Sequence, residues 1–351
     1  MIPSRDITFL KPDSAREAVL AWQDSRQEGA GPLYFGGGTE IVTLARENKL
    51  RADRFIACRT LPEVGLHSPG YPSGVPGEEG REEGGLLVWG SGLRLNEVAD
   101  RGMSLLLGLC CNGVADRTVR NSITLGGNIC GMLPYREAVL PFLLLQGQVE
   151  SLSGPDTREM YPLPERFSKR LGLAEGELVL SFCLEQALVA AVESRGVIRQ
   201  EEEPCRISAL ARGGRGGWFY ERRTAGGPVD YPLSTLVLVQ IDGEYRLALT
   251  GVFGYPLRAL RAEALLNGPR PEGGPAPETT PAQAVSPESD GWEALAGAAL
   301  DAEGLKYKTD LRGSGPYRRA VAVQSLARGL AELDALTGSP GPVGPGIGRD
   351  S

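Results

Sequence analysis

Two glycine-rich segments could bring a phosphate-bearing ligand close to the backbone. The first is Gly36-Gly37-Gly38-Thr39-Glu40, between an expected strand and an expected helix, and the second is Arg120-Asn121-Ser122-Ile123-Thr124-Leu125-Gly126-Gly127-Asn128. A strand–glycine–helix junction can hold an anion, because glycine has no side chain and a helix N-terminus presents free N–H groups. Adjacent glycines in a β-like run likewise indicate a close approach to the backbone. Two such loops in one domain fit one extended ligand with two phosphates.

Each candidate segment also has a simpler interpretation. The first loop is neither a P-loop nor a dinucleotide fingerprint, because no Gly-Lys-Ser/Thr follows it and its glycines lack the G-x-G-x-x-G spacing. A tight turn would explain the first loop, and a β-bulge would explain the second. Glu137, in Pro134-Tyr135-Arg136-Glu137, is placed at the start of an apolar helix, where the helix dipole favours a carboxylate. It could bind a ribose or ribityl hydroxyl, or it could only cap the helix.

Composition narrows the classes of protein. The chain has 351 residues, of which 41% are hydrophobic, so we expect about two domains with packed cores. The net charge is −7 and no stretch gathers the basic residues, which argues against nucleic-acid binding. The N-terminus has no signal-peptide run and no apolar stretch reaches the length of a membrane span, so we expect a soluble cytoplasmic protein.

Cysteine and histidine are arranged unfavourably for metal chemistry. None of the six cysteines forms a C-x-x-C pair, and adjacent Cys110 and Cys111 point apart in any regular element. We therefore expect small buried thiols rather than an iron–sulfur cluster or another metal site in this chain. His67 is the single histidine, which excludes a histidine-rich site. It lies in a Pro/Gly-rich loop, where a solvated side chain is a simpler interpretation than a covalent attachment site for a cofactor.

The spacing of apolar residues predicts a mixed α+β fold. In the first domain we expect strands at 8–12, 32–35, 54–57, 86–89, 124–129 and 177–184, and helices at 15–27, 41–48, 95–101, 105–111 and 135–145. In the second we expect a hairpin that turns at Asp242-Gly243 between β-rich runs 233–241 and 245–252, with helices at 258–266, 292–300 and 317–336. Residues 67–85 and 269–287 are expected to be exposed insertions, and residues 337–351 a disordered tail.

At this level of detail the chain resembles the FAD-binding, medium subunit of the xanthine dehydrogenase and carbon monoxide dehydrogenase family. Val119 to Ile129 is similar to the family segment Ile-Arg-Asn-x-Ala-Thr-Ile-Gly-Gly-Asn-Ile, and Gly36 to Glu40 is similar to its Ala-Gly-Gly-Thr-Asp loop. Weaker similarities follow in order along residues 5 to 335, ending at Asp310-Leu-Arg-Gly-Ser-Gly-Pro-Tyr-Arg-Arg319. The resemblance implies a two-lobed FAD-binding domain of the PCMH type over 1–186. A C-terminal domain with a small antiparallel sheet and helices would cover 205–336.

The resemblance also implies a function and a set of site residues. A large molybdopterin subunit would oxidise a substrate such as xanthine or another purine. FAD on this chain would take the electrons from the [2Fe–2S] clusters of a small partner subunit. NAD or another acceptor would then receive the electrons from FAD. Gly36, Gly37, Gly38, Thr39 and Glu40 would hold the pyrophosphate through backbone N–H groups. Thr124, Leu125, Gly126, Gly127 and Asn128 would hold its other side, Glu137 a hydroxyl, and Leu178 and Val179 a ring of the cofactor. No residue of this chain would be catalytic.

Two other functions stay open, and departures from the family pattern bear on the second of them. Met132-Leu133-Pro134 replaces the family's Ala-Ser-Pro, Glu137 replaces an Asp with a shifted spacing, and no Lys precedes Arg222-Arg223. One alternative is a stand-alone FAD-dependent oxidoreductase of the same fold superfamily. The other is a subunit that has lost its flavin and serves as a scaffold.

Overall fold

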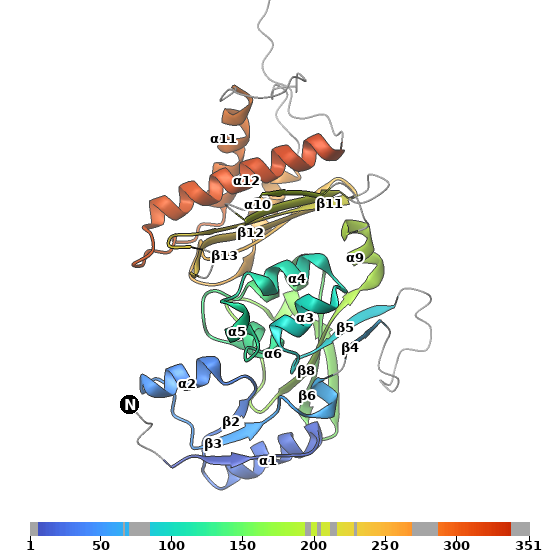
Figure 1. Cartoon of the computed structure of the whole chain (residues 1–351), viewed down its shortest axis with the longest axis vertical. Coiled ribbons are helices and arrows are strands. Elements are labelled where there is room, and N and C mark those ends of the chain that lie inside the picture. The colour runs from blue at the N-terminus through green and yellow to red at the C-terminus, as the bar shows by residue number, and fades with distance from the viewer. Residues whose placement is uncertain are drawn as a thin grey trace, which may run out of the picture. The chain divides into compact units, whose positions relative to one another are not determined.

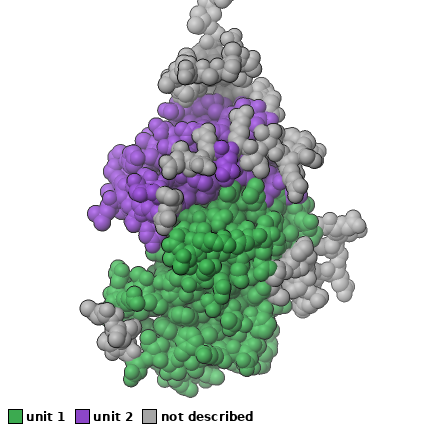
Figure 2. All heavy atoms as spheres, in the orientation of Figure 1, with its two compact units in different colours: residues 1–189 green, residues 190–351 purple. Residues whose placement is uncertain are grey.

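The computed structural model describes residues 6–65, 67–69, 85–193, 198–201, 205–210, 216–227, 230–268 and 287–337. It forms two compact units, Met1–Val189 and Ala190–Ser351, which Figure 2 colours separately. Helix α9 (Gln186–Glu193) crosses the boundary, which the sequence analysis placed at 186. Residues 70–84, 269–286 and 338–351, which hold most of the expected insertions and the expected tail, lie outside the described residues.

The first lobe of unit 1 is a small parallel sheet with two helices. Its strands are β1 (Thr8–Leu10), β2 (Pro32–Phe35) and β3 (Arg54–Ala57), in the order β1-β3-β2, and its helices are α1 (Ala15–Gln27) and α2 (Thr39–Arg46). Ser14 caps α1 by accepting the Glu17 N–H at 3.2 Å. The expected strands and helices of this lobe are confirmed within two residues at most boundaries.

The second lobe is built on a five-stranded sheet in which neighbouring strands are antiparallel. Its order is β4-β5-β8-β6-β7, with β4 (His67–Pro69), β5 (Leu86–Gly90), β6 (Gln148–Gly154), β7 (Thr157–Pro162) and β8 (Leu178–Glu185). Its helices lie along the chain between β5 and β8, and Figure 1 labels those from α3 to α6. They are α3 (Leu95–Arg101), α4 (Leu105–Asn112), α5 (Arg117–Arg120), α6 (Leu125–Cys130), α7 (Leu140–Leu144) and α8 (Leu163–Arg166), with short 3-10 turns η1 (Pro62–Val64) and η2 (Glu137–Val139).

The two lobes share one hydrophobic core. Ala18 and Val19 of α1 and Ile56 of β3 pack in the same cluster as Leu178 and Leu180 of β8. Burial of this apolar surface holds the lobes together.

Three sequence expectations in this lobe are wrong. Residues 67–69, which were placed in an exposed insertion with His67 in a loop, form strand β4 and pair with β5. Residues 124–129 form helix α6 and not a strand, because the Thr124 side chain caps the helix by accepting the Gly127 N–H at 3.0 Å. Residues 135–145 do not form one helix but η2 followed by α7. Arg136 is not helical (φ −126°, ψ 70°), because its side chain turns back to the carbonyls of Ile129 and Gly131.

Unit 2 is a six-stranded antiparallel sheet with helices on one face, as expected. The order is β14-β13-β12-β11-β10-β9, with β9 (Ile198–Glu201), β10 (Cys205–Leu210), β11 (Gly216–Thr224), β12 (Pro232–Ile241), β13 (Glu244–Thr250) and β14 (Leu257–Arg258). Asp242 (φ 49°) and Gly243 (φ 85°) make the β12–β13 turn, as a two-residue type I′ hairpin requires. Helices α10 (Leu260–Leu266), α11 (Pro287–Ala302) and α12 (Gly315–Thr337) cover a core of β11–β13 residues such as Phe219 and Leu238 (Figure 1).

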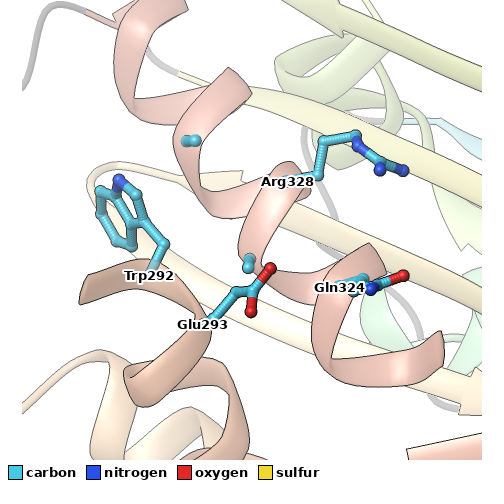
Figure 3. A pocket seen from close by; sticks show the side chains of 6 residues that line it. Trp292, Glu293, Gln324 and Arg328 are labelled. Carbon is cyan, nitrogen blue, oxygen red and sulfur yellow. The ribbon is translucent and has the colours of Figure 1, made fainter. Parts of the chain in front are cut away.

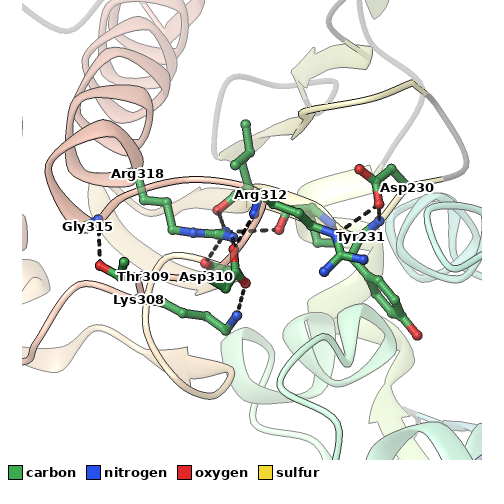
Figure 4. A network of polar contacts seen from close by, with 11 residues as sticks. Asp230, Tyr231, Lys308, Thr309, Asp310, Arg312, Gly315 and Arg318 are labelled. Atoms are coloured by element: carbon green, nitrogen blue, oxygen red, sulfur yellow. Dashed lines mark hydrogen bonds and ion pairs between the residues drawn. The ribbon is translucent and has the colours of Figure 1, made fainter.

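A buried arginine organises the strand ends of unit 2. Arg318 is fully buried, and its Nη1 donates to the carbonyls of Leu233 at 2.8 Å and Gly251 at 2.7 Å. Its Nη2 donates to Asp310 at 2.7 Å, and Figure 4 shows this network beside the ion pair of Arg312 with Asp230. The Asp310–Arg319 motif therefore has a structural role, because it bonds α12 to the strand ends of the sheet.

Over the part of the chain that the structure describes, no helix is both long and apolar enough to cross a membrane.

Candidate cofactor site

The first glycine loop forms a cradle of free backbone donors. It turns from β2 into α2, and Gly38 has φ 73°, a left-handed conformation that glycine adopts without strain. A Cβ at Gly38 would lie 2.3 Å from the Phe35 ring, so no larger residue fits. Within the described residues, no N–H from Gly36 to Glu40 donates to another protein group. Free N–H groups at a helix N-terminus are a site for an anion such as a phosphate.

The second glycine segment lies directly against this cradle. A Cβ at Gly36 would be 3.0 Å from Thr124 Oγ1, and one at Gly37 would be 1.8 Å from the carbonyl oxygen of Ser122. The fold therefore brings together two segments about 90 residues apart, as the sequence analysis expected for one extended ligand.

The N–H groups of the second segment, unlike those of the first, are already bonded. Leu125 N–H donates to Leu93 O and Gly126 N–H to Ser91 O, both at 2.8 Å. The Gly127 N–H donates to Thr124 Oγ1 at 3.0 Å, and the Asn128 N–H to Thr124 O at 2.8 Å. Leu125 to Asn128 therefore offer no free backbone donor, and their expected hold on the cofactor, through side chains or close approach, stays a prediction.

The two glycines of α6 differ in their surroundings. A Cβ at Gly126 would lie 2.8 Å from Ser91 Cβ, so this glycine is required by packing. Gly127 is exposed, and a Cβ there would meet a single described atom within 4 Å, Thr124 Oγ1 at 2.9 Å. Gly127 therefore leaves a bare backbone face that a ligand can approach.

Asn128 has the second feature that suits a ligand. Its side chain is only 8% exposed, yet its Oδ1 atom has no hydrogen-bond partner among the described residues. A buried polar atom without a partner costs on the order of 1–3 kcal/mol. A hydroxyl or N–H of a bound ligand would remove that cost.

Glu40 bonds the first segment to the stretch of chain that follows α6. Its two carboxylate oxygens accept the Met132 N–H at 3.0 and 3.1 Å. A Cβ at Gly131 would lie 2.6 Å from Glu40 Oε2, so glycine at 131 makes room for this contact. The sequence analysis assigned Glu40 to phosphate binding through its N–H, and its side chain has this additional bridging contact.

Two buried arginines brace the second segment from behind. Arg120 donates through Nη1 to the carbonyl of Ala115 at 2.6 Å and through Nε to Asn96 at 2.9 Å. Arg136 donates to the Gly131 carbonyl at 2.9 Å, and its burial lowers the pKa of its guanidinium. Neither guanidinium is directed to the first loop by these bonds, so both hold the backbone in place.

The amino-acid sequence matches a known family over the same region. A family described as the FAD binding domain in molybdopterin dehydrogenase matches residues 5–184, or 180 of the 351 residues. The chain belongs to this family. Its cofactor is therefore FAD, and the matched region contains both glycine segments. A comparison with curated proteins finds no significant match.

Solved structures share the fold over nearly the whole chain. Carbon monoxide dehydrogenase from Hydrogenophaga pseudoflava, in a form lacking the Mo-pyranopterin moiety, is 24% identical with a TM-score of 0.68, covering 95% of this chain and 99% of that one. Quinoline 2-oxidoreductase from Pseudomonas putida 86 is 16% identical with a TM-score of 0.66, covering 94% and 98%. Reconstituted CO dehydrogenase from Oligotropha carboxidovorans is 19% identical with a TM-score of 0.66, covering 95% and 99%. At these identities the likeness shows the fold.

The remaining residues expected to bind FAD lie deeper in unit 1. Glu137 is 1% exposed at the start of η2. Burial raises the pKa of the nearby Cys111 thiol, and the charge of Glu137 raises it further. Leu178 is part of the core shared by the lobes, and the carbonyl of Val179 accepts the Ser91 hydroxyl at 2.6 Å. Their contacts with FAD stay predictions.

The thiols of this domain are held neutral. Burial raises the pKa of Cys58, Cys130 and Cys183 to about 12. Among the described residues, no group of three or more His, Cys, Asp or Glu side chains is placed to hold a metal ion.

A pocket of about 340 Å³ lies in unit 2, between α11 and α12. Figure 3 shows Arg328 and Gln324 pointing away from the indole of Trp292. Arg328 is also bonded to the fully buried Glu221 at 3.0 and 2.9 Å. Because these polar groups diverge, they do not converge on one ligand position.

Proposed function

We propose that this chain is the electron-relaying FAD subunit of a three-subunit molybdenum hydroxylase. A small subunit with [2Fe–2S] clusters would deliver electrons to it, a large molybdopterin subunit would oxidise a purine such as xanthine, and NAD would be the acceptor. Membership of the molybdopterin dehydrogenase family supports the FAD role. The observation that carries it is the cradle of free N–H groups at Gly36 to Glu40, packed against Ser122 and Thr124 just before the helix that carries the bare face of Gly127.

The residues of the cradle suit the pyrophosphate of FAD. The free N–H groups of Gly36 to Glu40 would donate to phosphate oxygens, and the positive end of α2 would favour their charge. Gly127 would let the ligand approach the backbone, and Asn128 Oδ1 would accept a hydroxyl or N–H from it. Glu137 would accept a second hydroxyl, while Leu178 and Val179 would pack on a ring.

In this proposal the redox chemistry belongs to the cofactor, which takes up and releases electrons when bound. The chain's own residues bind it, orient it and set its electrostatic surroundings. The Cys58 and Cys130 thiols keep their protons in the neutral range, because desolvation raises the pKa of each to about 12.

The test begins with a tag on this chain, expressed alone and with its two partner subunits. FAD is added, the excess is removed, and the visible flavin absorption is compared with the protein concentration. We expect a ratio near one, with iron and molybdenum co-purifying only in the co-expressed sample. Absence of flavin from both samples would contradict the FAD role.

The substrate and acceptor need a second measurement on the co-purified complex. We expect xanthine to bleach the flavin absorption without oxygen, and NAD to restore it. Bleaching by quinoline or carbon monoxide but not by xanthine would refute the purine assignment. Recovery with an artificial acceptor but not with NAD would refute the assigned acceptor.

A further inference from the structure

One of the contacts between the first and second lobes of unit 1 is made by a tight turn, Ala174–Glu177, which precedes β8. Gly176 in this turn has φ 80°, and a Cβ there would lie 2.6 Å from the ring of Trp22. Trp22 belongs to α1 in the first lobe, so the turn is seated directly on that lobe. Only glycine fits this position, on grounds of both conformation and space.

A single tyrosine of the first lobe reaches this turn. The Tyr34 hydroxyl donates to the Gly176 carbonyl at 2.8 Å, across 142 positions of sequence. Burial raises the pKa of Tyr34, so its hydroxyl keeps the proton that it donates throughout the neutral range. The bond therefore ties the last part of β2 to the start of β8.

The turn is held equally firmly from the second lobe. Glu177 is 4% exposed, and its carboxylate accepts the hydroxyls of Ser151 at 2.6 Å and Tyr161 at 2.8 Å. Its other oxygen accepts the Ala174 N–H at 2.8 Å. With its own lobe fixing the turn, movement of Gly176 relative to Tyr34 would require the lobes to move apart.

The position of this bond along the chain gives it a consequence for the cofactor site. Tyr34 stands two residues before Gly36, where the free N–H groups begin, and Gly176 stands two residues before Leu178, which is assigned to a cofactor ring. Two residues of strand span about 7 Å. One hydrogen bond thus lies close to both the phosphate-binding edge and the ring-binding edge of the site.

We propose that Tyr34 is a positioning residue for FAD, which sets the separation between the phosphate cradle and the start of β8 through its bond to the Gly176 carbonyl. This inference rests on the proposed FAD role. Tyr34 itself need not touch the cofactor. Its effect is to hold the two edges at the spacing that lets one FAD molecule reach both, so part of the ordering is complete before binding.

The test compares Tyr34→Phe with Tyr307→Phe in the full-length chain. Tyr307→Phe is the matched control, because it also removes one tyrosine hydroxyl with a hydrogen bond at 2.8 Å, but in unit 2. We expect Tyr34→Phe to weaken FAD binding roughly three- to tenfold, mostly through faster dissociation, as expected for loss of one hydrogen bond. The control should bind FAD as the wild type does.

Three further outcomes separate the explanations. Equal FAD affinity for Tyr34→Phe and the control would overturn the positioning role, even if both variants unfold more readily. Trp22→Leu removes the ring beneath Gly176 and should also speed FAD dissociation, so an unchanged rate there would equally count against it. If the wild-type chain binds no FAD, either alone or with its partners, that result contradicts the proposed function. It is distinct from a failure of the positioning role of Tyr34, which requires a wild-type chain that binds FAD.

Discussion

Replacing each of the two α6 glycines by alanine, one at a time, tests whether Gly127 faces FAD. Gly126→Ala puts a methyl group 2.8 Å from Ser91 Cβ and 3.0 Å from Ser91 O, so α6 must move away from its support. Overpacking of this kind costs about 1–3 kcal/mol of unfolding free energy. In Gly127→Ala the new methyl group meets only Thr124 Oγ1, the atom that caps α6. Disturbing this cap costs up to about 1 kcal/mol, and the higher helix propensity of alanine offsets it by about 1 kcal/mol.

The two variants should therefore separate stability from binding. Urea unfolding followed by circular dichroism should show Gly126→Ala destabilised and Gly127→Ala within about 1 kcal/mol of the wild type. FAD binding, followed by quenching of FAD fluorescence, should be weaker for Gly127→Ala than for the wild type. A methyl group on the ligand face is expected to weaken FAD binding by at least roughly tenfold, or about 1.4 kcal/mol.

Gly65→Ala serves as the control for both glycine variants. Gly65→Ala adds a methyl group in unit 1 with no described atom nearer than 3.7 Å, and it should leave both measurements unchanged. If Gly127→Ala binds FAD with wild-type affinity, the bare face of α6 is not a ligand surface. If Gly126→Ala is as stable as the wild type, the packing of α6 on Ser91 has been misjudged.

Three other perturbations test separate parts of the molecule. Arg318→Met removes the donor to the Leu233 and Gly251 carbonyls and should cost about 1–3 kcal/mol for each acceptor left without a partner, measured by urea titration. FAD content in the surviving folded protein should stay at the wild-type ratio. Lost flavin with unchanged stability would contradict a structural role. Glu40→Ala removes the acceptor of the Met132 N–H and should weaken FAD binding roughly tenfold. Glu40→Gln keeps an acceptor and should retain most of the wild-type affinity. Equal loss of FAD affinity in both variants would show that the charge of Glu40 matters and not this hydrogen bond. Burial raises the pKa of the Cys183 thiol to about 12 from 9.0. Its contribution to the free energy of unfolding is therefore complete below pH 9 and is lost as the pH rises towards 12, at about 1.4 kcal/mol per pH unit. Cys183→Ala should flatten the alkaline fall in stability measured by urea unfolding, and an unchanged slope would contradict this assignment.

Local signals in the sequence predicted most of the elements. Ser14 before an apolar period placed α1, and Asp242-Gly243 placed the β12–β13 hairpin, because capping and type I′ turns depend on residues adjacent in the chain. The helix at 125–130 was not predicted. Two glycines lower helix propensity, and the compensating contacts with Leu93 and Ser91 come from a distant segment.

The site could be predicted in outline but not in its division of labour. Each glycine segment was identified from its composition, yet the sequence gives no sign that one keeps its N–H groups free while the other has bonded them within the fold. Tyr34 and the bridging contact of Glu40 were missed for a related reason. Their partners are the carbonyl of Gly176 and the N–H of Met132, and backbone groups leave no trace in residue type.

The contrast between the two glycine segments explains why this chain needs so many glycines at one place. Gly37, Gly38 and Gly126 are required because other protein atoms occupy the space of their Cβ atoms: the Ser122 carbonyl oxygen at 1.8 Å, the Phe35 ring at 2.3 Å and Ser91 Cβ at 2.8 Å. Gly37 lets the first segment approach Ser122 of the second, Gly38 lets the loop close against Phe35, and Gly126 lets α6 pack on Ser91. Gly127 has no such packing requirement, so at that position the missing side chain leaves room for something that is not protein. The free N–H groups, the bare face of Gly127 and the unpartnered Oδ1 of Asn128 all belong to this one junction, which is where the phosphates of an extended cofactor require donors and space.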